Sequence, residues 1–203
     1  LLLTASSSHL RQIPDSSPPE QTVKLIFIHH STGENWLTDG YGDLGRTLGE
    51  NNYFVSDTNY GWGPDSIGDR TDIPNWTEWF ASENTSTYMD ALFNESEQHA
   101  SYTRTLSEPG GENEIIMFKS CFPNSSLEGS PSDSPGSYEE MSVSGAKYVY
   151  NRILPYFATR PDKLFIVITA PPLSDSTYVE NARAFNQWLL NDWLDENNYA
   201  LNN

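Results

Sequence analysis

A serine directly after an apolar segment is the first residue of this chain that has the position of a nucleophile. Ser31 follows Val23–Ile28 (VKLIFI) and the pair His29-His30, and Gly33 stands two residues further on. A serine hydroxyl at the end of a buried strand can attack a carbonyl carbon, while nearby backbone N–H groups stabilise the oxyanion that forms. The alternative is that Ser31 only caps the helix that begins after it.

Two later loops supply residues that can assist such a serine. Gly61 follows the apolar segment Tyr53–Ser56, and a glycine there lets the backbone approach a ligand or simply makes a turn. Asn124 follows Glu114–Phe118, and its amide can donate to an oxyanion or cap the following loop. On these residues alone, both interpretations of each position stay open.

The loop after Gly61 is rich in charged and aromatic residues. The charged residues are Asp65, Asp69, Arg70 and Asp72. The aromatic residues are Trp62, Trp76, Trp79 and Phe80. The charges can hold a sugar or a cation and the rings can stack on sugars, whereas a solvated loop and packing against the domain are the alternatives. We expect the substrate to meet Trp62, Asp65, Asp69 and Arg70.

The remaining reactive side chains are His9, His29, His30, His99 and Cys121. His30 adjoins Ser31, and neighbours in an extended segment point to opposite faces, so we do not assign His30 as its base. We interpret His29 as a packed residue behind the serine, and we place His99 late on a surface helix and His9 in a leader. Cys121 is a thiol nucleophile only if a basic group lowers its pKa, and a buried structural cysteine is the alternative.

Apolar segments of strand length recur along the chain. They are Val23–Ile28, Tyr53–Ser56, Glu114–Phe118 and Lys163–Thr169. Continuous β-branched and aromatic residues, without alternation, are typical of strands covered on both faces. We therefore expect the first, third and fourth strands to be central and parallel.

Helical segments separate these strands. They are Leu37–Asn51, Thr85–His99, Tyr138–Phe157 and Thr177–Asn197, the last with Ser176 as its N-cap. Alternating strands and helices predict a right-handed, three-layer α/β/α domain with a parallel sheet of flavodoxin-like type. Ligands bind such sheets beyond the carboxyl ends of the strands, where Ser31, Gly61 and Asn124 fall.

Composition narrows the possible partners of this 203-residue chain. Asp and Glu number 28 against 11 Lys and Arg, a formal net charge of −17. An acidic surface repels phosphate backbones and anionic lipids, which argues against nucleic-acid and membrane partners. No segment approaches the roughly 18 consecutive apolar residues of a transmembrane helix. The chain has no Walker-type loop, no Cys/His zinc spacing and no EF-hand loop, so we predict neither a cofactor nor a metal.

Taken together, the three loops resemble the SGNH/GDSL hydrolase superfamily, which comprises esterases, lipases and carbohydrate O-deacetylases. That family has a serine after its first strand, a glycine after its second and an asparagine after its third, and Ser31, Gly61 and Asn124 fall in these places in order. The triplet Asn59-Tyr60-Gly61 also resembles the second block. The usual Gly-Asp-Ser-Leu is replaced by His29-His30-Ser31-Thr32, and the third block is not Gly-x-Asn-Asp.

The resemblance implies hydrolysis of a small extracellular ester or an acylated carbohydrate through a Ser31 acyl-enzyme. The N–H groups of Ser31 and Gly61 and the Asn124 amide would stabilise the oxyanion. The family's Asp-x-x-His pair is not found in this chain, so we expect it after a further strand beyond Asn203 and expect the 203 residues to be nearly inactive without it. The alternative function is a non-catalytic carbohydrate- or surface-binding domain on the same scaffold.

The amino-terminal residues differ in composition from the rest. Leu1–Ser8 (LLLTASSS) resembles the end of a signal peptide, although a cloning remnant would look similar, and Ser16–Glu20 (SSPPE) is typical of a linker. We therefore assign residues 1–22 to a leader and linker and residues 23–203 to the α/β domain. The expected location is secreted or extracytoplasmic.

Overall fold

Four parallel strands form the centre of the protein. The computed structural model describes residues 17–63, 66–68, 70–136 and 141–199. The strands are β1 (Val23–His29), β2 (Tyr53–Asn59), β3 (Ile115–Lys119) and β4 (Leu164–Ile168), and they lie in the order β2-β1-β3-β4. All three strand pairs are parallel, with Phe27 opposite Asp57 and Ile28 opposite Phe118. The predicted α/β fold with a parallel sheet is confirmed.

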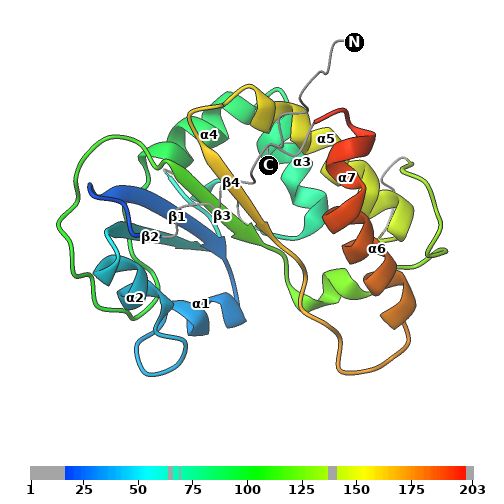
Figure 1. The fold of residues 1–203 in the computed structure, drawn as a ribbon, viewed down its shortest axis with the longest axis horizontal. Helices are drawn as coiled ribbons and strands as arrows, with labels where there is room; N and C mark the ends of the chain where they lie inside the picture. Colours follow the sequence, from blue (N-terminus) through cyan, green and yellow to red (C-terminus); the bar gives the residue numbers. More distant parts are fainter. Residues whose placement is uncertain (1–16, 64–65, 69, 137–140, 200–203) are drawn as a thin grey trace, which may run out of the picture.

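Helices cover both faces of this sheet (Figure 1). The α-helices are α1 (Thr32–Leu37), α2 (Leu44–Glu50), α3 (Trp76–Ala81), α4 (Thr85–Asn94), α5 (Val143–Ala158), α6 (Val179–Asn191) and α7 (Trp193–Glu196). Two short 3₁₀ helices are η2 (Ile73–Asn75) and η3 (Phe122–Ser125). Helices α1 and α2 lie on one face of the sheet, and α3 to α6 pack on the other, which gives three layers.

Alternation along β1 and β3 divides the core between these layers. Ile26 and Ile28 of β1 join the cluster with α3 to α6, whereas Leu25 and Phe27 join the cluster with α1 and α2. Burial of such a side chain stabilises the fold by about 1.5–3 kcal/mol. The two central strands therefore anchor both helical layers, and their carboxyl ends are held firmly in place.

The fourth strand departs from the prediction that it is central. Among the described residues β4 pairs only with β3, so it lies at one edge of the sheet. Its residues are only half-buried and Leu164 is 55% exposed. The apolar run predicted two covered faces, but hydrophobicity does not reveal how many neighbouring strands pair with a strand.

Two predicted helices end or begin elsewhere. Helix α4 stops at Asn94 because the Glu95 carboxylate accepts the N–H groups of Ser96 and Glu97, which draws the chain out of the helix. His99 therefore lies in an extended segment, not on a helix. Ser176 is not the N-cap of α6; that position is Tyr178, and Ser176 only accepts the N–H of Val179 through its carbonyl.

The other predicted helices are present with shorter bounds. Helix α5 begins at Val143, where the Ser142 hydroxyl accepts the N–H of Gly145 as a true N-cap. The expected helix 177–197 divides into α6 and α7 at Asp192. Among the described residues, no helix is both long enough and apolar enough to cross a bilayer.

Candidate functional site

A pocket opens at the point where the chain changes direction across the sheet. The chain moves from β1 to β2 on one side and then to β3 on the other, and ligands bind open α/β sheets at such a switch point. The pocket has a volume of about 490 Å³. Its lining residues are His30, Tyr60, Arg70, Asp72, Cys121 and Pro123. They come from the loops that follow β1, β2 and β3.

Ser31 stands next to this pocket in a strained turn. It separates the end of β1 at His29 from the start of α1 at Thr32, and its backbone has φ 52° and ψ −125°. Its side chain is exposed and makes no capping hydrogen bond, which argues against a cap as its main role. A serine on a sharp strand-to-helix turn is the arrangement that exposes Oγ in hydrolases with a nucleophile elbow. Such strain costs about 1–3 kcal/mol and persists where surrounding structure enforces it.

The turn is tight because the helix crosses directly over the strand end. A Cβ built on Gly33 would lie 2.6 Å from the Cβ of His29 and 3.3 Å from its Nδ1. Only glycine permits this approach. His29 and Gly33 therefore contact each other, and Ser31 lies at the tip of the turn between them.

Backbone donors near Ser31 have no protein acceptor. The N–H groups of Ser31, Thr32 and Gly61 make no hydrogen bond to the described residues. Gly61 has φ 118°, and a Cβ there would lie 2.9 Å from the carbonyl oxygen of Ser66. A glycine is needed at this position, and its N–H remains a candidate oxyanion donor. Gly61 itself lines a neighbouring pocket with Glu95 and His99, while the adjoining Tyr60 lines the pocket of His30.

Asn124 has a structural task in addition to any catalytic one. Its Nδ2 donates to Asp72 Oδ1 at 2.6 Å and its Oδ1 accepts the N–H of Ile73 at 2.9 Å. The side chain is buried and ties η3 to the loop that forms one wall of the pocket. One amide hydrogen of Asn124 is thereby used, and the second has no acceptor among the described residues.

His30 and Lys119 give the site its electrostatic character. Burial lowers the pKa of His30, the nearby Lys119 cation lowers it further, and Asp72 opposes the shift. Burial also lowers the pKa of Lys119, whose fully buried Nζ has no hydrogen-bond partner among the described residues. His30 is consequently neutral around pH 7, the form that accepts a proton.

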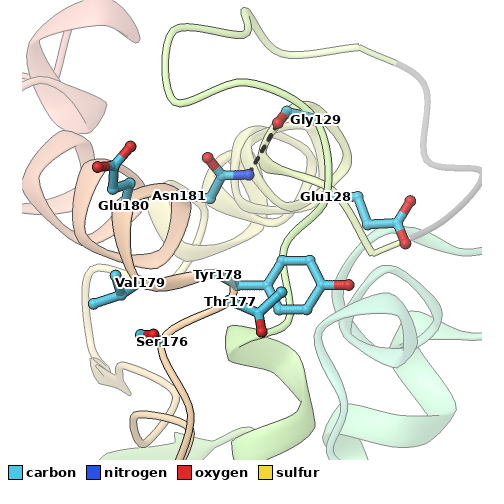
Figure 2. Close-up of a pocket in the computed structure, with 8 residues that line it drawn as sticks. All are labelled: Glu128, Gly129, Ser176, Thr177, Tyr178, Val179, Glu180 and Asn181. Carbon is cyan, nitrogen blue, oxygen red and sulfur yellow. Dashed lines mark hydrogen bonds between the residues drawn. The ribbon is translucent and has the colours of Figure 1, made fainter.

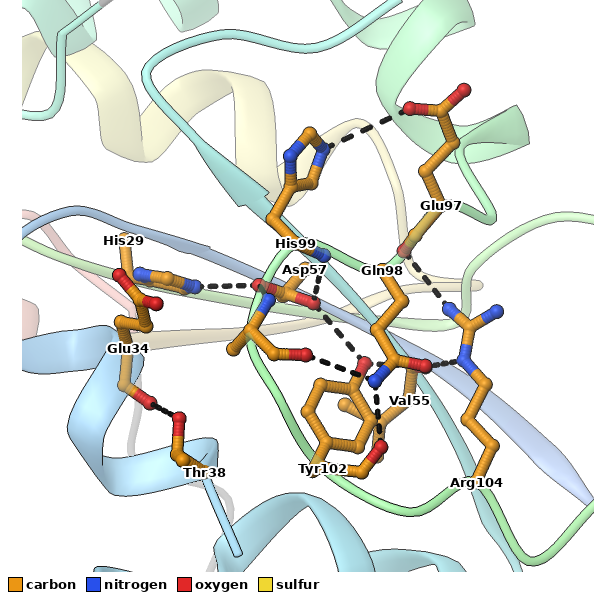
Figure 3. Close-up of polar contacts among 11 residues, drawn as sticks. His29, Glu34, Thr38, Val55, Asp57, Glu97, Gln98, His99, Tyr102 and Arg104 are labelled. Atoms are coloured by element: carbon orange, nitrogen blue, oxygen red, sulfur yellow. Dashed lines mark hydrogen bonds and ion pairs between the residues drawn. The ribbon is translucent and has the colours of Figure 1, made fainter.

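Behind the turn, His29 forms a buried pair with Asp57 (Figure 3). Both side chains are fully buried, and Nε2 of His29 lies 2.8 Å from Asp57 Oδ2. The same carboxylate accepts the N–H groups of His99 and Ala100 and the hydroxyl of Tyr102. Burial raises the pKa of Asp57, but the hydrogen bonds from His29, His99 and Ala100 outweigh it, so the pKa lies below its ordinary value.

Because an ionised carboxylate only accepts hydrogen bonds, this pair also fixes the tautomer of His29. Nε2 carries a proton, and Nδ1 is buried without a hydrogen-bond partner among the described residues. The interpretation of His29 as a packed residue behind the serine is confirmed. The ring supports the turn from beneath through its contact with Gly33.

Buried polar atoms without partners concentrate at this end of the sheet. Eleven such side-chain atoms occur among the described residues, and six lie at or just after the carboxyl ends of β1, β2 and β3. The six belong to His29, His30, Thr58, Asn59, Lys119 and Ser120. Each costs about 1–3 kcal/mol if it stays unsatisfied, so their clustering indicates a site at which stability is traded for function.

The predicted substrate-binding residues have different outcomes. Trp62 is 2% exposed, donates to the Tyr88 carbonyl and packs edge-on against Trp79, so most of its ring is in the core. It does not line the pocket of His30 but another one, together with Gly61 and His99. Its neighbours Trp76, Trp79 and Phe80 are likewise in the core. Arg70 does line the pocket, whereas Asp65 and Asp69 lie outside the described residues.

The fold brings to the site several groups that the sequence motifs do not single out. Asp57 and Lys119 lie beside apolar segments, where a charged residue is itself unusual and is the signal that indicates them. Tyr60 and Asp72 belong to the loop after β2, and nothing in their sequence context sets them apart. Cys121 is half-buried and lines the pocket, so its interpretation as a buried structural residue is wrong.

A second cavity lies at the start of α6 (Figure 2). Its volume is about 570 Å³, and its walls are Glu128, Gly129 and residues 176–181. Asn181 closes one side by donating to the carbonyls of Leu127 and Gly129. Although larger, this cavity is lined by no histidine or lysine and by no residue with the backbone strain of Ser31. The pocket beside Ser31 is therefore the better candidate.

Comparison with known proteins gives no further identification. No protein-family model, no curated protein and no solved structure matches this chain. Among the described residues, no three His, Cys, Asp or Glu side chains come together in a way that could hold a metal ion. The function is therefore argued from the pocket itself.

Proposed function

We propose that this protein is a carboxylic ester hydrolase that uses Ser31 as its nucleophile. The observation that carries the proposal is the backbone of Ser31, strained at φ 52° on the turn from β1 to α1 and exposed at the switch point of the sheet. The order of Ser31, Gly61 and Asn124 along the chain, which resembles that of SGNH hydrolases, supports the same reaction. The substrate class is an acyl group on a carbohydrate or another small ester.

In this mechanism Ser31 Oγ attacks the ester carbonyl, and its proton passes to a general base. The free N–H groups of Ser31 and Gly61, with the remaining amide hydrogen of Asn124, stabilise the tetrahedral oxyanion. The alcohol leaves with the proton, and water then hydrolyses the acyl-enzyme by the same steps. The resemblance places the base beyond Asn203, but of the described histidines His30 lines this pocket, and the turn at Ser31 ends the extended geometry on which its exclusion rested. His30, which burial keeps neutral, is therefore the base in these 203 residues, and turnover by this chain depends on it.

The test is reaction with a fluorophosphonate probe, which labels activated serines, together with turnover of p-nitrophenyl acetate. We expect labelling at Ser31, identified by peptide mass spectrometry, and loss of both labelling and turnover in Ser31→Ala. Ser86→Ala is the control, because Ser86 is equally exposed but lies in the regular helix α4.

Two results would refute the proposal. One is equal turnover by wild type and Ser31→Ala, and the other is no labelling of Ser31 in folded protein. A third variant, His30→Gln, then locates the base. General-base assistance is worth about 10²–10⁴-fold, so a smaller loss would place the base elsewhere in the protein.

A further inference from the structure

An exposed aromatic ring in an unusual backbone conformation stands at the mouth of the pocket. Tyr60 directly follows β2, lines the pocket and is 57% exposed. Its φ is 62°, and among the six described non-glycine residues with positive φ it is the only aromatic one. The other five are Ser, Asp and Asn, of which Asp and Asn adopt this conformation readily. For a bulky side chain the conformation is a genuine outlier, and such outliers concentrate at ligand sites.

The orientation of the Tyr60 ring is fixed from one side. Its centroid lies 5.1 Å from that of His30, and the two ring planes are inclined by 22°, so the rings are stacked. His30 covers one face of the tyrosine, and the large exposed fraction of the side chain leaves the other face to solvent. Because His30 is bonded to Ser31, the stacking also fixes the Tyr60 ring relative to the turn that carries the nucleophile.

Polar groups suited to hydroxyl recognition surround the ring. Arg70 lines the same pocket, is exposed and forms no ion pair with the described residues. Asp72 also lines it, and only its Oδ1 is used, by Asn124, within the described chain. A donor and an acceptor beside an aromatic face match the chemistry of a sugar, whose hydroxyl groups donate and accept while its C–H face packs on a ring.

We propose that Tyr60 is the platform on which a sugar ring of the substrate stacks, with Arg70 and Asp72 binding its hydroxyl groups. The proposal names the alcohol part of the ester and rests on the proposed function for the position of the acyl group at Ser31. A neutral sugar fits best, because the net charge of −17 repels nucleotides and acidic polysaccharides.

The first test measures binding without catalysis. Affinity electrophoresis in gels that contain soluble xylan, glucomannan or galactomannan compares wild type with Tyr60→Gly, Tyr60→Phe and Tyr41→Ala. Glycine is at ease at φ 62°, so Tyr60→Gly is expected to fold with an undiminished thermal midpoint. Tyr41 is the matched control, since it is 77% exposed and lines no cavity near the site.

We expect at least one polysaccharide to retard wild type, Tyr60→Phe and Tyr41→Ala but not Tyr60→Gly. The loss of stacking is expected to weaken binding by about tenfold. Equal retardation of wild type and Tyr60→Gly, or no retardation of wild type by any of the three, would overturn the platform.

The second test separates this inference from the proposed function. The acetylated forms of the same polysaccharides and p-nitrophenyl acetate are compared as substrates. We expect Tyr60→Gly to raise KM on a sugar acetate by about tenfold more than on p-nitrophenyl acetate, with Tyr41→Ala unchanged on both. Turnover of p-nitrophenyl acetate without sugar binding would overturn the platform and keep the hydrolase. Sugar binding without any turnover would keep the platform and favour a carbohydrate-binding domain.

Discussion

Replacing Gly33 with alanine tests whether the turn at Ser31 depends on the close crossing of α1 over β1. The new Cβ would lie 2.6 Å from His29 Cβ and 3.0 Å from its Cγ. Carbon atoms prefer about 3.5–4.0 Å, so the helix and strand must separate by about 1 Å. The imidazole cannot yield, because it is fully buried and held by Asp57 at 2.8 Å.

Two opposing effects decide the sign of the stability change. Overpacking of this kind costs about 1–3 kcal/mol. Alanine recovers about 0.5–1 kcal/mol over glycine inside a helix. The expected result is therefore a net loss of up to about 2.5 kcal/mol in the free energy of unfolding. Because a displacement of about 1 Å at a reacting atom can cost 10²-fold in rate, labelling of Ser31 should slow by about that factor.

The assay combines urea unfolding with the rate of fluorophosphonate labelling in the folded protein. Asn35→Ala is the control, since Asn35 is an exposed residue of the same helix. If Gly33→Ala is as stable as wild type and is labelled at the same rate, the crossing does not position Ser31 and the reasoning fails.

Three further substitutions test the polar groups around the site. Lys119→Met removes a buried amine that has no partner among the described residues, so it should stabilise the protein by about 1–3 kcal/mol in urea unfolding at pH 7. The gain should shrink as the pH rises toward about 10.5, because the lysine of the unfolded protein then also loses its proton. A variant that is equally or less stable at pH 7 would contradict this. Asp57→Asn should lower the free energy of unfolding most at neutral pH, because the lowered pKa of Asp57 means that its ionised form stabilises the folded protein. The loss of stability should fade as the pH falls below about 4, where the carboxyl group takes up a proton. A loss that does not depend on pH would show that the charge is not responsible. Asn124→Ala removes the partner of the Ile73 N–H and of the Asp72 carboxylate. Amide hydrogen exchange in residues 70–73 should therefore become faster. Unchanged protection would show that other contacts hold this loop.

The parallel sheet could be predicted from the sequence because the central strands have hydrophobic side chains on both faces. Val23–Ile28 and Glu114–Phe118 are apolar except for Lys24 and Glu114, and β1 and β3 are the strands buried between two helical layers. The run Lys163–Thr169 has the same composition, yet β4 is at an edge. The pattern of hydrophobic side chains indicates whether each face of a strand is covered by helices. It does not indicate how many strands pair with that strand, because backbone hydrogen bonds can be made by almost any residue type.

The site was predicted only in part for a related reason. Ser31, Gly61 and Asn124 could be placed because parallel strands end at the same edge of a sheet. The positive φ of Ser31 and Tyr60 could not be foreseen, since neither residue type requires it. The His29–Asp57 contact joins residues 28 apart and is set by the pairing of β1 with β2. An aspartate that follows the apolar segment Tyr53–Ser56 so closely is the sequence feature that indicates it.

The clustering of unpartnered polar atoms at one end of the sheet also bears on how such a protein can change over evolutionary time. The apolar residues of the strands and of the helices that cover them form the core, whereas the last residues of the strands include His29, Asn59 and Lys119, which have buried polar atoms without partners among the described residues. A substitution at these ends removes an unsatisfied buried polar atom more often than a stabilising contact. The protein therefore keeps enough stability to accept new side chains there. The residues at the carboxyl ends of the strands can therefore change, and with them the reaction or ligand, while the core sequence stays nearly constant.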